Sequence, residues 1–298
     1  MLKKPVLFAG SSNLKLAQDV CRELKINLGA MDLEQFPDGE TNVQILEDVR
    51  GRDVFVLQSI VRQPNHYLFE LLIIIDAIKR ASAKTITAVI PYLGYCRADR
   101  KSKPGIPITA KLVANVLATA GITNLITFDL HSEQVEGFFE TNVDHLHCQK
   151  LLCDNAKHLV EDCVVVAPDI GGIKIAERTT KLLATKLALI NKERLSPYDV
   201  SMTLVGSVCN KNVLIIDDLC STAGTLVEAA NLCKEQGAKK IIAAVTHGLF
   251  VGDAIEKLNA SALEYLLITD TIEQHTCTPF IKIISVAPML AYAIKAIC

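Results

Sequence analysis

The residues best suited to chemistry in this sequence follow a strand-like apolar run, Val213–Ile216. Asp217 and Asp218 come directly after this run, and the small, hydroxyl-rich segment Ser221–Thr225 leads into a helix-like stretch. A turn that enters a helix presents free backbone N–H groups and the positive end of the helix dipole to an anion. The pattern therefore predicts a phosphate cradle with two acids beside it, placed for sugar hydroxyls or a metal. An ordinary strand–turn–helix junction with a Ser/Thr cap is the alternative.

The composition describes a globular protein of one large or two medium domains. Its 298 residues are 50% apolar and 21% charged, with a formal net charge of −2, which suits a substantial core and argues against disorder. No long basic block favours nucleic acid as a partner, and no segment is apolar enough for a membrane span. The ten cysteines contain no Cys-x-x-Cys pair. This usage suits reduced thiols, so we expect a cytoplasmic protein.

One segment rich in histidine and cysteine could be read as a metal site. It contains His145, His147 and Cys148, and Cys153 follows. The spacing matches no standard zinc pattern, so we interpret the segment as buried thiols beside surface histidines.

Short apolar strands alternate with helical stretches along the chain, which predicts an α/β fold with mostly parallel sheets flanked by helices. The two halves also resemble each other, since residues 49–54 are similar to residues 208–213 and residues 83–88 to residues 238–243. We interpret this as two copies of one domain, covering residues 1–147 and 148–298. The register sets Gln58-Ser59 opposite Asp217-Asp218, so we expect only the C-terminal copy to bind a sugar phosphate.

Other polar stretches lie where a second ligand could bind. They are the turn Phe36–Glu40, the basic segment Arg97–Lys103, and the segments Asp129–His131, Pro168–Gly172 and Asn191–Arg194. Taken singly, each has an ordinary structural explanation: half-buried packing for the aromatic ring, a solvated loop for the basic segment, a core imidazole for the histidine, and surface charges for the last.

Taken together and in order, these and several further stretches resemble one family, the ribose-phosphate pyrophosphokinases, or PRPP synthetases. The resemblance covers nearly the whole chain. Its most specific pieces are Phe36–Glu40, Glu70–Leu72, Thr85–Tyr92, Pro107–Ala114, Asp129–His131, Gly137–Phe139, Pro168–Asp169, Gly171–Gly172, Lys192–Arg194, Asp217–Thr225 and Thr246–Gly248. The resemblance implies two tandem type I phosphoribosyltransferase-like domains, which agrees with the repeat.

The resemblance implies that the chain transfers the pyrophosphoryl group of ATP to the C1 hydroxyl of ribose 5-phosphate, giving PRPP and AMP for nucleotide biosynthesis. The implied cofactor is Mg²⁺, because phosphoryl-type transfers spread negative charge over non-bridging oxygens. The implied assembly is a homo-oligomer of dimers that associate into a hexamer, with the nucleotide site where two subunits meet.

The resemblance also implies roles for individual residues. Lys192 and Arg194 match the catalytic cations. The ribose 5-phosphate site is matched by Arg194, Asp217, Asp218, Ser221, Thr222, Ala223, Gly224 and Thr225. The ATP site is matched by Phe36, Asp38, Gly39, Glu40, Arg97, Ala98, Asp99 and Lys101. His131 and Asp169 match metal-associated positions, and Asp129 could assist from nearby.

Three positions depart from the family pattern. Gly105 stands where the basic loop usually carries an arginine, Ala98 replaces a glutamine, and Ser221 replaces an aspartate. These changes leave two alternatives: a weakly active or silent paralogue that binds nucleotide beside an active partner, and a phosphoribosyltransferase that consumes PRPP. We expect an active synthetase, because the two expected catalytic cations and the histidine and aspartate expected at the metal are all present.

Overall fold

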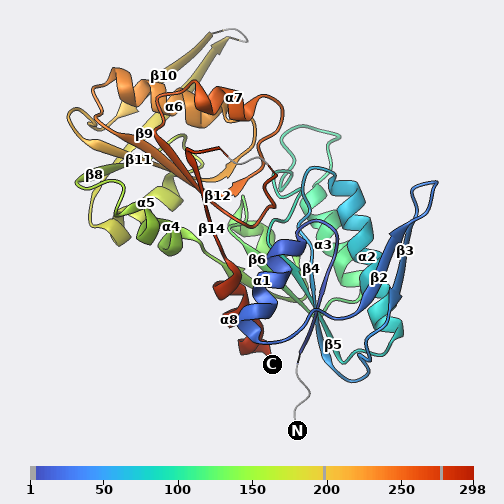
Figure 1. Cartoon of the computed structure of the whole chain (residues 1–298). Helices are drawn as coiled ribbons and strands as arrows, with labels where there is room; N and C mark the ends of the chain where they lie inside the picture. Colours follow the sequence, from blue (N-terminus) through green and yellow to red (C-terminus); the bar gives the residue numbers. More distant parts are fainter. Residues whose placement is uncertain (1–4, 197–198, 276–277) are drawn as a thin grey trace. The chain divides into compact units, whose positions relative to one another are not determined.

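The computed structural model describes residues 5–196, 199–275 and 278–298 (Figure 1). Contacts within the chain divide it into two compact units. The first runs up to residue 146 and also contains residues 271–273 and 285–298, whereas the second contains residues 147–270 and 274–284. Each unit has its own central sheet.

The first unit is built on a sheet in which all neighbouring strands are parallel. In spatial order the strands are β1 (Val6–Ala9), β4 (Asp53–Leu57), β5 (Thr85–Ile90), β6 (Asn124–Phe128) and β7 (Asn142–Leu146). The helices of this unit are α1 (Leu14–Leu24), α2 (Pro64–Arg80), α3 (Thr109–Ala120) and α8 (Ala287–Ile297), with a short 3-10 helix at Glu133–Phe138. Strands β1, β4, β5 and β6 are nearly continuous apolar runs, as expected of parallel strands covered on both faces, whereas the edge strand β7 mixes polar and apolar residues.

A separate antiparallel hairpin, β2 (Met31–Gln35) and β3 (Thr41–Ile45), belongs to the same unit. Apolar residues alternate with polar ones in both strands, so one face of the hairpin can pack while the other meets solvent. Strand β3 packs against helix α2. The turn at residues 36–40 connects the two strands of this hairpin.

The second unit is built on a sheet that is parallel except at one edge, where β10 (Asp199–Val205) runs antiparallel to β9 (Lys186–Ser196). The sheet continues through β8 (Cys163–Ala167), β11 (Asn212–Cys220), β12 (Ile241–Gly248), β13 (Tyr265–Thr269) and β14 (Ile281–Ile284). The helices of this unit are α4 (Gln149–Ala156), α5 (Ile173–Leu183), α6 (Gly224–Glu235) and α7 (Ala254–Asn259). The predicted α/β class with mostly parallel sheets is confirmed.

The two sheets repeat one topology. Strands β8, β11, β12, β13 and β14 lie side by side in the same order as β1, β4, β5, β6 and β7. In both units a hairpin is inserted in the sequence between the first two of these strands, β2–β3 in one and β9–β10 in the other. This pattern supports the interpretation of two copies of one domain. The separate functions of the two copies stay a prediction.

Strand β11 is longer than predicted. The sequence predicts a strand over residues 213–217, but β11 continues through Asp218 to Cys220, because β12 continues beside it as far as Gly248. The sequence likewise predicts a strand over residues 186–190, but β9 extends to Ser196. Across the part of the chain that the structure describes, no helix has the length and apolar character needed to cross a membrane.

Candidate active site

The expected sugar-phosphate residues of the second unit lie at one edge of its sheet. Asp217 and Asp218 are in the second half of β11, and Lys192 is in β9 beyond its pairing with β8. Asp169 follows the end of β8 by two residues. Because β8, β9 and β11 are parallel, their carboxyl ends share an edge, where open α/β sheets bind ligands.

The acid pair is crowded with negative charge. The backbone N–H of Asp218 donates a hydrogen bond to the Asp217 carboxylate at 2.9 Å, and Asp218 is only 9% exposed. Burial, followed by the charges of Asp218 and Asp169, raises the pKa of the Asp217 carboxyl well above its usual value. A cluster of this kind attracts a cation or the hydroxyl groups of a sugar.

The cradle between β11 and α6 has a left-handed residue at its centre. That residue is Ala223, with φ of 63°, and it is also the N-cap of α6. The alternative interpretation, an ordinary junction with a Ser/Thr cap, is therefore wrong, because the N-cap is an alanine and makes no side-chain cap hydrogen bond. The methyl side chain of Ala223 cannot accept a hydrogen bond, so it leaves the first amides of α6 uncapped and directed at any anion that binds there.

Gly224 is not required by the protein's own packing. A Cβ atom placed on it would approach nothing closer than the hydroxyl of Thr222, at 4.0 Å, and its φ is not in the left-handed region. The absent side chain leaves space at the helix N-terminus that a bound group can occupy. The prediction that Gly224 lets the backbone come close to a ligand is compatible with this geometry.

Lys192 reaches the same helix. Its ammonium Nζ lies 2.6 Å from the Oε2 atom of Glu228 on α6, four residues beyond Gly224. The ion pair therefore places an expected catalytic cation beside the helix that carries the cradle. For Arg194 the structure describes only the backbone, which pairs with Val200 of β10, and its side chain lies outside the described residues.

In the first unit, the tip of the β2–β3 hairpin presents the expected adenine-stacking residue. The tip closes through hydrogen bonds from the Phe36 N–H to the Glu40 carbonyl and from the Gly39 N–H to the Phe36 carbonyl, both 2.8 Å. Gly39 has φ of 95°, which glycine adopts readily. The carboxylate of Asp38 accepts the N–H of Glu40 at 3.2 Å. Phe36 is 48% exposed, so its ring is available for stacking.

The basic loop of the first unit begins at a strained residue. Tyr95 has φ of 68°, and its phenol donates a hydrogen bond to Asn65 at the start of α2. The N–H of Ala98 donates to the Tyr95 carbonyl at 3.0 Å. Arg97 and Lys101 are exposed, whereas Ala98 and Asp99 are partly buried. A non-glycine residue in this conformation is uncommon, and such residues cluster at functional sites.

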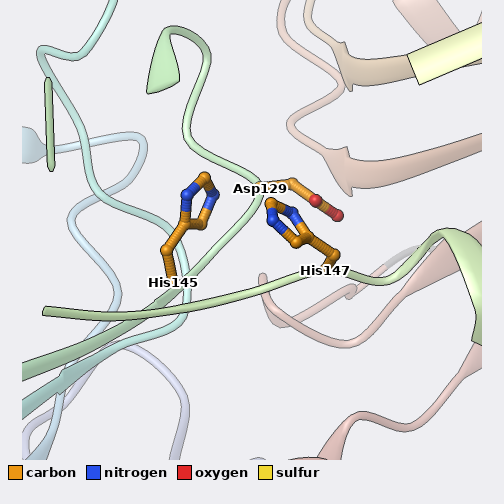
Figure 2. A group of neighbouring side chains, drawn as sticks. All are labelled: Asp129, His145 and His147. Carbon is orange, nitrogen blue, oxygen red and sulfur yellow. The ribbon is translucent and has the colours of Figure 1, made fainter. Parts of the chain in front are cut away.

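Asp129 belongs to a compact group of possible metal ligands with His145 and His147 (Figure 2). One ligand atom from each lies within 4.8 Å of the others, and His147 directly follows Leu146 at the end of β7. His131, which the family resemblance placed at the metal, is exposed and is not part of this group.

His145 has a structural contact that competes with metal binding. Its Nε2 accepts the backbone N–H of Leu130 at 2.9 Å, and its Nδ1 lies 3.6 Å from the carboxylate of Glu136. The side chain is only 6% exposed, so the interpretation of this residue as a surface histidine is wrong. Cys148 and Cys153 are buried, as predicted, and burial raises the pKa of the Cys153 thiol to about 11.

In the first unit, the carboxyl ends of the strands are occupied by the protein's own polar contacts. Gln58 and Ser59 follow β4, at the place of the acid pair in the repeat, and both are fully buried. Gln58 accepts the N–H of Ser12 at 3.0 Å, and buried Glu70 accepts the N–H of Ser11 at 2.8 Å. These contacts supply internal partners where the second unit has its cradle. They support the expectation that only the C-terminal copy binds the sugar phosphate.

Comparisons with known proteins agree in both halves of the chain. Residues 5–121 match the family model for the N-terminal domain of ribose phosphate pyrophosphokinase. Residues 177–298 match the model of the phosphoribosyl synthetase-associated domain.

Full-length relatives carry the same description. The chain is 44% identical over 297 residues to a ribose-phosphate pyrophosphokinase of Fusobacterium nucleatum, covering 98% of this chain and 94% of the relative. It is 45% identical to the protein of that name from Bacillus caldolyticus, with the same coverage. The crystal structure of phosphoribosylpyrophosphate synthetase from Mycobacterium smegmatis superposes with a TM-score of 0.94 at 40% identity, covering 99% of both chains.

Proposed function

Because the chain belongs to the ribose-phosphate pyrophosphokinase family, we propose that it transfers the pyrophosphoryl group of ATP to ribose 5-phosphate. The C1 hydroxyl oxygen of the sugar forms a bond to the β-phosphorus, the bond from that phosphorus to the oxygen bridging to the α-phosphate breaks, and AMP leaves. The hydroxyl proton passes to solvent. The two alternative functions gain no support from the comparisons.

The observation that carries this proposal is the joint placement of three features at one edge of the second sheet. They are the uncapped N-terminus of α6, the partly buried Asp217 and buried Asp218 of β11, and the Lys192 ammonium beside α6. The amides and hydroxyls of residues 221–225 bind the 5-phosphate, and Asp217 and Asp218 accept hydrogen bonds from the ribose hydroxyls. Lys192 and Arg194 stabilise the charge of the migrating group.

The acids fit a bound Mg²⁺ ion. The charges of Asp169 and Asp218 act on Asp217 and raise its pKa, so a divalent cation that neutralises the cluster would be favourable. Mg²⁺ prefers oxygen ligands and keeps several waters. We assign it to Asp169 together with the nucleotide phosphates, and the family resemblance adds His131 and Asp129 as metal-associated residues. When bound, it would neutralise negative charge on the polyphosphate.

The nucleotide is assigned to the first unit. Phe36 stacks on adenine, while Asp38, Gly39 and Glu40 orient the base and ribose from the hairpin tip. Arg97, Ala98, Asp99 and Lys101 face the phosphates from the basic loop. We further propose that the protein is cytoplasmic and that its copies assemble into dimers and a hexamer.

Product identity tests the proposal. Purified protein given ribose 5-phosphate, ATP and Mg²⁺ should release AMP in equal amount to PRPP, as measured by chromatography. ADP as the product would show phosphoryl rather than pyrophosphoryl transfer. Absence of both products would favour a silent paralogue.

Lys192 is the residue whose removal should matter most. Lys192→Ala should lower kcat by a factor on the order of 10³, because a preorganised charge at the migrating group typically contributes about 3–4 kcal/mol. Circular dichroism should show an unchanged fold, since the side chain is partly exposed. Turnover near that of the wild type would remove Lys192 from the mechanism.

A further inference from the structure

Lys192 has a carboxylate partner on the helix that carries the cradle. The Glu228 side chain is 45% exposed and the Lys192 side chain 27% exposed, so both remain accessible to solvent and to a ligand. Residues four apart on a helix lie on the same face, so Glu228 lies one turn beyond Gly224 on the same face of α6. Glu228 is thus an anion that contacts the expected catalytic cation and lies one helical turn from the expected phosphate site.

We propose that Glu228 is a positioning residue that holds the Lys192 ammonium beside α6 and competes for it with the polyphosphate of ATP. This inference rests on the proposed function, which gives Lys192 its anionic ligand. Lys192 must exchange the carboxylate for a phosphate oxygen during each turnover. The carboxylate left behind then lies near the bound anions and repels them.

The size of the effect follows from the exposure of the pair. Partly exposed ion pairs are worth about 0.2–1 kcal/mol, so removing the competitor should raise kcat/KM for ATP about 1.4- to fivefold. If the pair served only to tie β9 to α6, its loss would lower stability and leave kcat/KM for ATP unchanged. These outcomes are separable in one set of variants.

The test compares Glu228→Gln with Glu228→Asp and with a matched control, Glu235→Gln. Glutamine keeps the shape of Glu228 and removes its charge, whereas aspartate keeps the charge. Glu235 is exposed at the last position of the same helix, so its variant removes the same charge about 10 Å farther along the axis. Steady-state AMP formation is measured against ATP concentration at low and high KCl.

We expect kcat/KM for ATP to rise in Glu228→Gln, with Glu228→Asp and Glu235→Gln close to the wild type. The gain should shrink at high KCl, because salt screens exposed charges. A Glu228→Gln value equal to or below that of the wild type would overturn the inference. Glu228→Ala, for which the same rise is expected, replaces the glutamine variant if that variant does not fold. Wild-type protein that forms no AMP would instead refute the proposed function.

Discussion

Asp217 is a residue at which folding and ligand binding make opposite demands. The sequence placed it next to Asp218 and predicted a site for sugar hydroxyls or a metal. In the structure, burial and two neighbouring carboxylates raise the pKa of Asp217. A buried charge without a counter-ion is costly. Without a bound cation, the acid pair thus lowers the folding stability of the protein, and its role is to bind a ligand.

Asp217→Asn should therefore stabilise the protein at neutral pH. The raised pKa means that the folded state binds the Asp217 proton more tightly than the unfolded chain does. The stability linked to this proton is fully present below the ordinary value of 3.8 and is lost as pH rises through the folded-state value. The variant should exceed the wild type by about 1 kcal/mol or more at pH 7, with little difference near pH 4.

Urea unfolding in EDTA-treated protein at the two pH values measures this difference. Asp253→Asn is the control, because a side-chain hydrogen bond from Lys257 lowers the pKa of that exposed carboxyl. The control should show no gain at neutral pH. Equal stabilities of Asp217→Asn and the wild type at pH 7 would contradict the electrostatic argument.

Several residue-scale features could not be read from the sequence. The left-handed Ala223 is the N-cap of α6 in place of a serine or threonine, and alanine gives no local signal for that conformation. The Lys192–Glu228 pair joins residues 36 positions apart, so only the fold brings them together. His145 was misread because its burial depends on the packing of β6 against β7.

At the scale of elements, the buried parallel strands were the most predictable part. Their continuous apolar runs predict strands over residues 6–9, 85–90, 163–167 and 265–269, which are the bounds of β1, β5, β8 and β13 in the structure. The β2–β3 hairpin was recognised only as the turn at its tip, although its apolar–polar alternation was a usable strand signal. Strand β9 continues through the polar segment after Ile190, and this extension depends on pairing with β10.

The basic loop is the element whose sequence departs most from the family. Gly105 has φ of 81°, and a Cβ atom there would meet nothing within 4 Å. An arginine side chain thus has space, but its backbone would be strained by about 1 kcal/mol. The same guanidinium could contribute about 1.5–3 kcal/mol through charged hydrogen bonds to ATP.

The comparison of Gly105→Arg with Gly105→Ala separates these two effects. Alanine carries the backbone strain alone, so its kcat/KM for ATP should fall by up to about fivefold. Arginine should exceed alanine by about tenfold or more, because both variants share the strain. Steady-state assays of AMP formation measure both. Equal values for the two variants would mean that the remaining cations of the loop already suffice.

At the scale of the whole molecule, the two compact units are not two consecutive halves of the sequence. The sequence halves suggested a single crossing near residue 147, but the C-terminal segment 285–298 belongs to the first unit. Helix α8 packs against α1 (Figure 1), and Lys295 donates to the Glu23 carbonyl at 3.4 Å. The sequence predicts a last helix from Pro288 onward but does not show which sheet that helix covers.

The return of α8 predicts where a core mutation at the end of the chain will act. Leu290 in α8 is fully buried, so Leu290→Ala should cost about 2–5 kcal/mol through lost burial and a cavity. The damage should appear as faster amide hydrogen exchange in α1 and β1, at the opposite end of the sequence, while β11 and β12 keep their protection. The matched variant is Leu258→Ala in α7 of the second unit, where the leucine is 1% exposed. Leu258→Ala should speed exchange in the second unit and leave α1 and β1 protected. Faster exchange confined to β12 and β13 in Leu290→Ala would contradict the division into units.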